Sequence, residues 1–431
     1  MTNCTPENWI SQQEADCNSV PASLPAEAGS NPSKFESPLM TVICLTRLLI
    51  YSSIPLTMIP GLDGLRAIAF LLVFALHTRY LQIGWTGVSL FFVLSGFLIT
   101  GILLDMKNEF PPREYFIKFY GRRFLRIFPL YYFYLMLVGV VTSWLITVPY
   151  RPNYMQIFWD QVRYAVFYVY DFFFATVRFQ HSHFLDHFWS LSVEEQFYIF
   201  WPLLILLTPE KHYKKLFLAF ICIGPALRMV VLLIHSSGMV RFLADSPEVV
   251  IYPLPFSHVD AFALGALISR FSIPTARKQF IVLAGFIPFL GFTIQYLATN
   301  SIGTISAFGF PLLLPEGKQF LWGYSLLNYF FALLIYRVAK EGWGLRVLEW
   351  EPLRYLGRIS YGLYVYHFPI IWFAGRIADL GVKPPLLQPL TALIAFLATL
   401  AIASMSYFLL EKPILDLKDR FFSIAHEKRP A

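Results

Sequence analysis

The residues best suited to chemistry are Arg66, His77 and Glu194, three ionisable side chains inside apolar segments. Such groups are costly in a bilayer and usually face a protein interior or a wet cavity. Arg66 and His77 are eleven residues apart, which is about 16 Å and three turns of a helix, so both lie on nearly the same face. One cavity could reach both. Two side chains that extend to opposite membrane surfaces would satisfy the same spacing.

Glu194 lies between Ser190 and Tyr198 at four-residue intervals, a spacing that places all three on one helical face. Its expected depth in the membrane matches that of His77. A histidine beside a carboxylate is the minimal apparatus for taking a proton from an attacking hydroxyl, because the carboxylate fixes the tautomer and stabilises the imidazolium. The alternative is a Glu194 that is protonated or bonded to a neighbour on its own helix.

Arg122, Arg123 and Arg126 lie in a predicted cytoplasmic loop that leads directly into an apolar span. Arginine binds phosphate through two parallel hydrogen bonds, so this cluster could hold the phosphates of a nucleotide-bearing donor. Membrane topology and contact with anionic lipids would explain the same residues.

Three other features indicate structure more than catalysis. The segment HSHFLDH (181–187) has histidines at ligand spacing, but we expect it to be a loop without a metal ion. Ser95 and Gly96 are typical of close helix packing. His367 lies inside an apolar segment, where we expect a structural role. We therefore predict no metal site and no permanently bound cofactor.

The elements that position these residues are apolar runs. Of the 431 residues, 57% are apolar and 14% are charged, a composition typical of membrane proteins. Runs long enough to cross a bilayer fall at 66–82, 87–104, 128–148, 188–207, 216–235, 254–270, 280–297, 320–338, 357–376 and 386–409. We predict an all-α, polytopic membrane bundle of about ten transmembrane helices, and an interfacial or re-entrant helix at 156–178.

The chain divides into three parts. Residues 1–57 form a polar leader, predicted to be disordered, with an ambiguous apolar segment at 39–57 that leaves one extra N-terminal span open. Residues 58–420 form the transmembrane domain, and 421–431 form a short basic tail on the cytoplasmic side.

The loop charges give the orientation. Lys and Arg number 22 in one set of alternate loops and 8 in the other, so both ends of the ten-span core are predicted to be cytoplasmic. We expect a multi-pass protein of the plasma (inner) membrane. The net charge of +7 follows from this topology, and no nucleic-acid partner is expected.

Seven motifs in chain order resemble the acyltransferase-3 family of membrane O-acyltransferases across residues 59 to about 420. They are LDGLRAIAFLLVFALH, FFVLSGFLI, YGRRFLRIFPLYY, WSLSVEEQFYIFWP, HVDAFALGALIS, ISYGLYVYHFP and YFLLEKP. The resemblance implies transfer of an acyl group, often acetyl, from a coenzyme A thioester on the cytoplasmic side. The implied acceptor is a carbohydrate, glycolipid or glycan hydroxyl.

The resemblance also implies roles for particular residues. His77, Glu194 and Arg66 match the catalytic positions, with His77 as the general base. The donor-binding positions fall on Asp63, Arg122, Arg123, Arg126, Trp189, Ser190 and Tyr198. A C-terminal hydrolase-like domain that some members carry is not in this chain, which implies a stand-alone transferase or one that hands the group to a separate partner.

The competing interpretation is a polytopic transporter or exporter in which His77 and Glu194 form a proton relay. Transporters of that kind tend to have repeated halves, and the sequence contains no repeat that we can detect. The sequence leaves the acceptor, the acyl chain length and the oligomeric state open.

Overall fold

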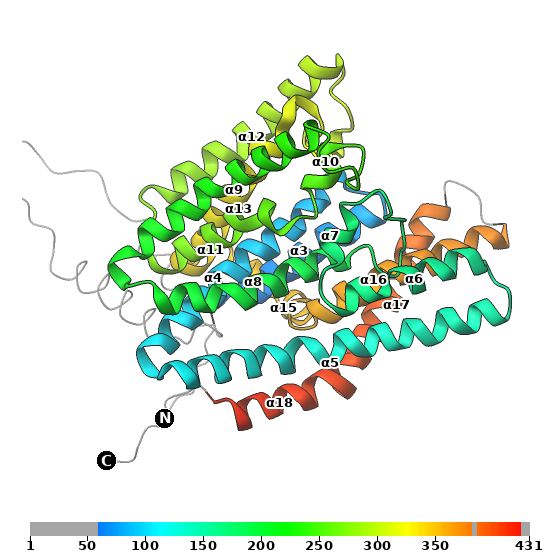
Figure 1. Ribbon diagram of the computed structural model, residues 1–431, viewed down its shortest axis with the longest axis horizontal. Helices are drawn as coiled ribbons and strands as arrows, with labels where there is room; N and C mark the ends of the chain where they lie inside the picture. Colours follow the sequence, from blue (N-terminus) through cyan, green and yellow to red (C-terminus); the bar gives the residue numbers. More distant parts are fainter. Residues whose placement is uncertain (1–58, 382–385, 424–431) are drawn as a thin grey trace, which may run out of the picture. The chain divides into compact units, whose positions relative to one another are not determined.

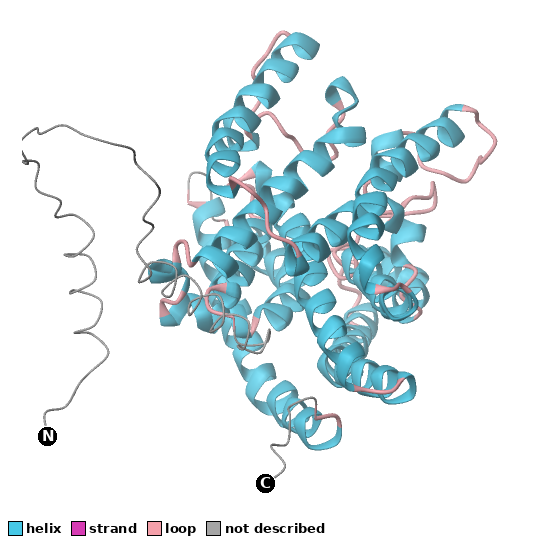
Figure 2. Cartoon of the chain, turned by 90° about the vertical axis from the view of Figure 1, so that its left-hand side faces the viewer, coloured by secondary structure: helices cyan, strands magenta, loops and turns pink. Residues whose placement is uncertain are grey.

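The computed structural model describes residues 59–381 and 386–423. These residues lie in the second of two units of the chain, residues 54–431. Within the described residues the fold is helical and contains no strand (Figure 2). The predicted leader and the ambiguous segment at 39–57 lie outside the described residues, as does most of the predicted tail.

Sixteen α-helices make up the described part of the chain (Figure 1). They are α3 (Leu62–His77), α4 (Thr86–Glu109), α5 (Pro112–Thr147), α6 (Pro152–Val166), α7 (Tyr170–Phe174), α8 (Phe188–Leu207), α9 (Tyr213–Ser236), α10 (Pro247–Ile251), α11 (Val259–Arg270), α12 (Ala276–Thr299), α13 (Gln319–Glu341), α14 (Leu345–Leu348), α15 (Glu351–Arg358), α16 (Ser360–Ala374), α17 (Leu387–Ser406) and α18 (Lys412–Phe421).

Six helical segments among the described residues are long and apolar enough to cross a membrane. They are Gln82–Glu109, Pro112–Thr147, Phe188–Leu207, Glu210–Ser236, Ala276–Thr299 and Leu387–Leu417. The other four predicted spans fall on α3, α11, α13 and α16. Of these, α3, α11 and α16 have only 16, 12 and 15 residues, fewer than the about 20 that a bilayer requires. The count of ten spans is therefore not confirmed.

The arginine cluster lies in a helix, which corrects the prediction that Arg122, Arg123 and Arg126 lie in a loop. Helix α5 is continuous from Pro112 to Thr147 and includes all three arginines, with Pro129 inside it. Proline at the first helical position starts the helix without losing a backbone hydrogen bond. The apolar pattern of the sequence predicted only the second half of α5, because a helix can begin well before the part of it that is embedded in the membrane.

The segment predicted as one interfacial helix at 156–178 is two helices instead. Helix α6 ends at Val166 and the short α7 begins at Tyr170. Between them Tyr168 has a φ of 53°, a left-handed conformation that a helix cannot continue through. The segment HSHFLDH lies in the following loop and turns, as predicted.

Close packing of α4 against α11 forms the centre of the described unit. A Cβ atom at Gly96 would lie 2.1 Å from the backbone oxygen of Phe262, and one at Gly265 would lie 2.1 Å from that of Val93. Small residues let two helix backbones approach closely in membrane proteins. The contact also fixes Ser95, the residue next to Gly96.

A buried ion pair joins α9, α11 and α13. Arg228 donates to Asp260 at 3.0 Å, to the Ser257 carbonyl oxygen at 2.6 Å and to the Leu321 carbonyl oxygen at 2.9 Å. Both charged side chains are fully buried. A buried pair of this kind is tolerated because every charge has partners, and removing one partner would leave an uncompensated charge.

We expect Gly96→Ala to destabilise the protein, because the added methyl group would overlap the α11 backbone. Overpacking of this kind typically costs about 1–3 kcal/mol, which thermal unfolding of the purified protein in detergent would detect. Gly285→Ala is the matched control, since no atom lies within 4 Å of a Cβ there. Equal melting temperatures for the two variants would contradict the packing account.

Candidate active site

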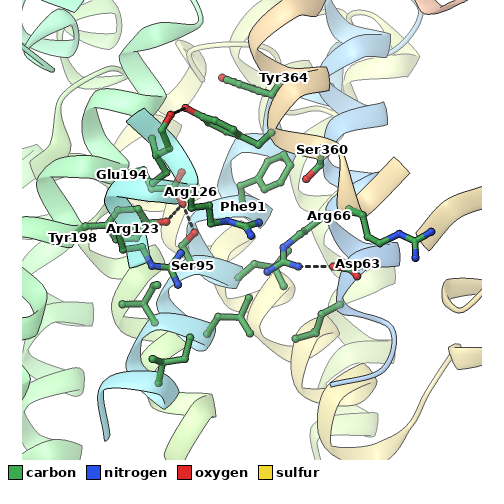
Figure 3. Close-up of a pocket in the computed structure, with 18 of the residues that line it drawn as sticks. Asp63, Arg66, Phe91, Ser95, Arg123, Arg126, Glu194, Tyr198, Ser360 and Tyr364 are labelled. Carbon is green, nitrogen blue, oxygen red and sulfur yellow. Dashed lines mark hydrogen bonds and ion pairs between the residues drawn. The ribbon is translucent and has the colours of Figure 1, made fainter. Parts of the chain in front are cut away.

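A cavity of about 480 Å³ lies among α3, α4, α5, α8, α15 and α16 (Figure 3). That volume is within the range of small-molecule sites. Its wall combines apolar side chains with a high density of charge. The charged residues that line it are Asp63, Arg66, Arg122, Arg123, Arg126, Glu194, Glu195, Glu349, Arg354 and Arg358.

The first turns of α3 supply Asp63 and Arg66. The Arg66 guanidinium donates to the Asp63 carboxylate at 2.5 Å, across one helical turn. This contact orients the guanidinium while leaving it on the cavity wall (Figure 3). Asp63, predicted to bind the donor, and Arg66, predicted to be catalytic, therefore both line the cavity.

Helix α5 supplies Arg122, Arg123 and Arg126, and all three line the cavity. Arg122 donates to the Phe422 carbonyl oxygen at 3.0 Å. The Arg123 guanidinium lies over the Tyr198 ring, 5.4 Å from its centroid. Although the predicted loop is a helix, the predicted clustering of the three arginines on one site agrees with the geometry.

Two further cationic residues of the cavity, Arg354 and Arg358 on α15, were missed by the sequence analysis. Both are bonded to Glu351, at 3.0 and 2.5 Å. In the sequence, Arg354 and Arg358 belong to a basic segment that was predicted to be cytoplasmic. Membrane topology alone explains such a segment, so it did not indicate a binding site. The packing of α15 against α3 brings these residues to the site.

Helix α8 contributes Ser190, Glu194 and Tyr198, and all three line the cavity, as their spacing indicated. The Glu194 carboxylate accepts hydrogen bonds from the hydroxyls of Ser95 and Tyr198 (Figure 3). Ser95 therefore belongs to the site, although its motif indicated only helix packing. These two hydrogen bonds fix the position of the Glu194 carboxylate on the cavity wall.

Trp189 does not line the cavity, in contrast to its expected role in donor binding. Its ring packs against those of Tyr252 and His258, with centroid distances of 4.7 and 5.6 Å. The side chain is 5% exposed, so within the described structure Trp189 is a core residue.

His77 is also not among the described residues that line the cavity. It lies at the last residue of α3, where its Nδ1 is 2.8 Å from Nε2 of His367 and its ring stacks on Phe368 at 4.3 Å. The predicted contact of His77 with Glu194 is not among the interactions of either residue. Equal depth in the membrane could not predict whether His77 and Glu194 are in contact. Depth does not determine toward which neighbouring helix each side chain points.

The hydrogen bonds of His367 determine the tautomer of both histidines. Nδ1 of His367 is 2.6 Å from the Tyr364 carbonyl oxygen, which can only accept, so this nitrogen carries the proton. Nε2 of a neutral His367 must then accept from Nδ1 of His77. The remaining nitrogen of His77, Nε2, keeps its lone pair, as a general base requires.

Tyr364 contacts both the histidine pair and the cavity. Its carbonyl oxygen accepts from His367, while its hydroxyl lines the cavity and lies 2.5 Å from the Ser190 hydroxyl. The two parts of the predicted site are therefore adjacent and joined through α16. Among the described residues there is no group of three or more metal-ligating side chains.

The chain belongs to the acyltransferase-3 family, because the model of that acyltransferase domain matches residues 59–408. The match covers α3 through α17. Of the residues that line the cavity, it leaves out only Leu415, which lies on α18. The class of protein that the resemblance indicated is thus established. A search of solved structures gives no match to this chain.

Several curated relatives are similar over most of this chain. Peptidoglycan O-acetyltransferase OatA of Listeria monocytogenes is 30% identical, over 83% of this chain and 56% of its own length. O-acetyltransferase OatA of Staphylococcus aureus is 27% identical, over 86% and 59%. The putative peptidoglycan O-acetyltransferase YrhL of Bacillus subtilis is 29% identical, over 85% and 56%. The matched part thus spans less than three-fifths of these relatives, and the transporter interpretation has no support among them.

Proposed function

We propose that this protein is a membrane-bound O-acyltransferase that moves an acyl group, acetyl in the simplest case, from coenzyme A to a glycan hydroxyl. The observation that carries the proposal is an arginine-rich cavity that lies next to a histidine pair with one basic nitrogen free. The names of the relatives, which are O-acetyltransferases and in part peptidoglycan O-acetyltransferases, support the same reaction class and a glycan acceptor.

The donor's phosphates bind the arginines of the cavity. Arg123 and Arg126 on α5 and Arg66 on α3 offer forked donors that match phosphate geometry. Arg354 and Arg358 extend the cationic wall, as expected for a donor with several phosphates. The basic loops support a cytoplasmic position for this end of α3, where acyl-coenzyme A is available as a soluble donor.

The pantetheine arm extends from the arginines along α3 toward His77. The eleven residues between Arg66 and His77 correspond to about 16 Å, a length suited to that arm. Val88, Phe91 and Leu191 give this part of the cavity an apolar lining. The thioester carbon then lies near the histidine pair.

His77 acts as the general base. Its Nε2 takes the proton of the acceptor hydroxyl as the hydroxyl oxygen bonds to the thioester carbon. The carbon–sulfur bond breaks, and coenzyme A leaves as a thiolate that takes the proton back from His77. His367 holds His77 in the required tautomer through the 2.8 Å hydrogen bond. Glu194 positions Ser95 and Tyr198 on the cavity wall instead of contacting the base.

This scheme requires no metal ion and no permanently bound cofactor, since acyl-coenzyme A is a substrate. The protein is a multi-pass protein of the plasma membrane, with both ends of the transmembrane core on the cytoplasmic side. The positive-inside charge distribution is the support for this orientation.

We expect Arg126→Gln to raise the KM for acetyl-coenzyme A by about tenfold or more, because a charge-assisted bond to phosphate is worth about 1.5–3 kcal/mol. The assay is transfer of radiolabelled acetyl groups by membranes that contain the variant. Arg113→Gln is the matched control, since Arg113 is exposed on the first turn of the same helix and does not line the cavity. Equal KM values for the two variants would refute the donor site.

Replacement of His77 by Ala should abolish transfer while the protein stays folded in the membrane. His367→Gln should keep a larger part of the activity than His367→Phe, since only the amide offers an oxygen that can accept from His77. We expect kcat to change and the KM for acetyl-coenzyme A to stay the same. Turnover by His77→Ala at the wild-type rate would exclude this residue as the base.

A further inference from the structure

Along α16 the donor cavity ends at Tyr364. Three residues of this helix line the cavity, namely Ser360, Tyr361 and Tyr364 (Figure 3), and no later residue of the fully described helix does. His367, which holds His77, follows Tyr364 by three residues, less than one helical turn. Tyr364 is therefore the last cavity residue of α16 before the histidine pair.

Packing fixes the position of the Tyr364 ring. The side chain is 6% exposed. Its ring centroid lies 5.4 Å from that of His367, 5.7 Å from that of His187 and 6.3 Å from that of Phe91. A ring that is held on several sides keeps its hydroxyl in one place. A hydrogen-bond donor that is already in place requires no rearrangement when negative charge develops beside it.

The Tyr364 hydroxyl has more acceptors than its one proton can use. It lies 2.5 Å from the Ser190 hydroxyl and 3.2 Å from the His187 carbonyl oxygen. Ser190 itself donates to the same carbonyl oxygen at 3.0 Å. If the Tyr364 proton turns toward a ligand, the Ser190 proton therefore keeps its acceptor. No buried donor is then left without a partner, so the change carries no desolvation penalty of that kind.

The carbonyl oxygen of a thioester is a suitable ligand for this hydroxyl. When an alcohol adds to the thioester carbon, negative charge develops on that oxygen, and a fixed neutral donor stabilises it. In the proposed reaction the thioester lies beyond the arginines, near the histidine pair, and Tyr364 lines the cavity there. Of its neighbours on the cavity wall, Phe91 is apolar and Ser190 has already used its proton.

We propose that the Tyr364 hydroxyl donates a hydrogen bond to the thioester carbonyl oxygen and is a second catalytic residue beside His77. This inference rests on the proposed acyl transfer. As the acceptor oxygen bonds to the thioester carbon, the electron pair of the C=O double bond moves onto the carbonyl oxygen, and the hydrogen bond from Tyr364 strengthens. When the carbon–sulfur bond breaks, the double bond forms again and the hydroxyl returns to Ser190. Tyr364 keeps its proton in both steps.

The first test is Tyr364→Phe, which keeps the ring and removes only the hydroxyl. Membranes that contain the full-length variant are assayed for transfer of radiolabelled acetyl groups to glycan. We expect kcat to fall about 100-fold or more, the usual effect of removing one donor of this kind, while the KM for acetyl-coenzyme A stays the same. Tyr366→Phe is the matched control, since Tyr366 lies on the same helix, donates to Ser406 at 3.2 Å and does not line the cavity. Equal kcat values for the two variants would overturn the inference.

Infrared spectroscopy separates this role from a purely structural one. His77→Ala should bind acetyl-coenzyme A without turnover, so the band of a carbon-13-labelled thioester carbonyl can be recorded in the bound state. We expect this band at a lower frequency than that of free acetyl-coenzyme A, because a hydrogen bond weakens the C=O bond. Adding Tyr364→Phe should remove most of the shift. An unshifted band in His77→Ala, or a shift that survives the loss of the hydroxyl, would overturn the inference.

Failure of the proposed function would give a different result. If the wild type neither binds acetyl-coenzyme A nor transfers its label to glycan, the reaction class itself is wrong. If the wild type transfers the label and Tyr364→Phe does so at the same rate, the acyl transfer stands and only the role of Tyr364 is wrong.

Discussion

Charge inside an apolar helix bundle must be paired, and this constraint organises the structure. A guanidinium or carboxylate removed from water destabilises the fold unless partners surround it. Arg228 and Asp260 satisfy each other and tie three helices together. Arg66 and Asp63 satisfy each other on one helix, and Glu194 is held by two hydroxyls. In the donor cavity several arginines surround a shared space, so an anionic ligand there would add a further partner for their charge.

The site is divided between two ends of α3. The arginines surround its first turns, and the histidine pair lies at its last residue. Tyr364 joins the two ends, because its hydroxyl lines the cavity while its carbonyl oxygen holds His367. Such a division suits a reaction whose donor and acceptor come from different sides of a membrane. In a reaction of that kind neither substrate has to cross the bilayer, since only the acyl group passes.

Much of the fold was predictable, because hydrophobic length and loop charge are local properties of the sequence. All ten predicted spans fall on helices, although three of these are shorter than a bilayer requires. The one-face spacing of Ser190, Glu194 and Tyr198 was predictable for the same reason. The partner of His77 could not be predicted, because His367 is 290 residues away in the sequence. Which side of a helix faces which neighbour depends on the packing of the whole bundle. The role predicted for Trp189 came from a motif position alone, and in the structure its side chain packs in the core and does not line the cavity.

We propose that an acyl group passes from a donor on the arginine side to an acceptor on the histidine side of this membrane protein. Proteoliposomes with acetyl-coenzyme A sealed inside and the acceptor glycan only outside test it most directly. We expect labelled glycan outside while the vesicles remain sealed. Label that forms only after the vesicles are made permeable, with donor and acceptor on the same side, would contradict it.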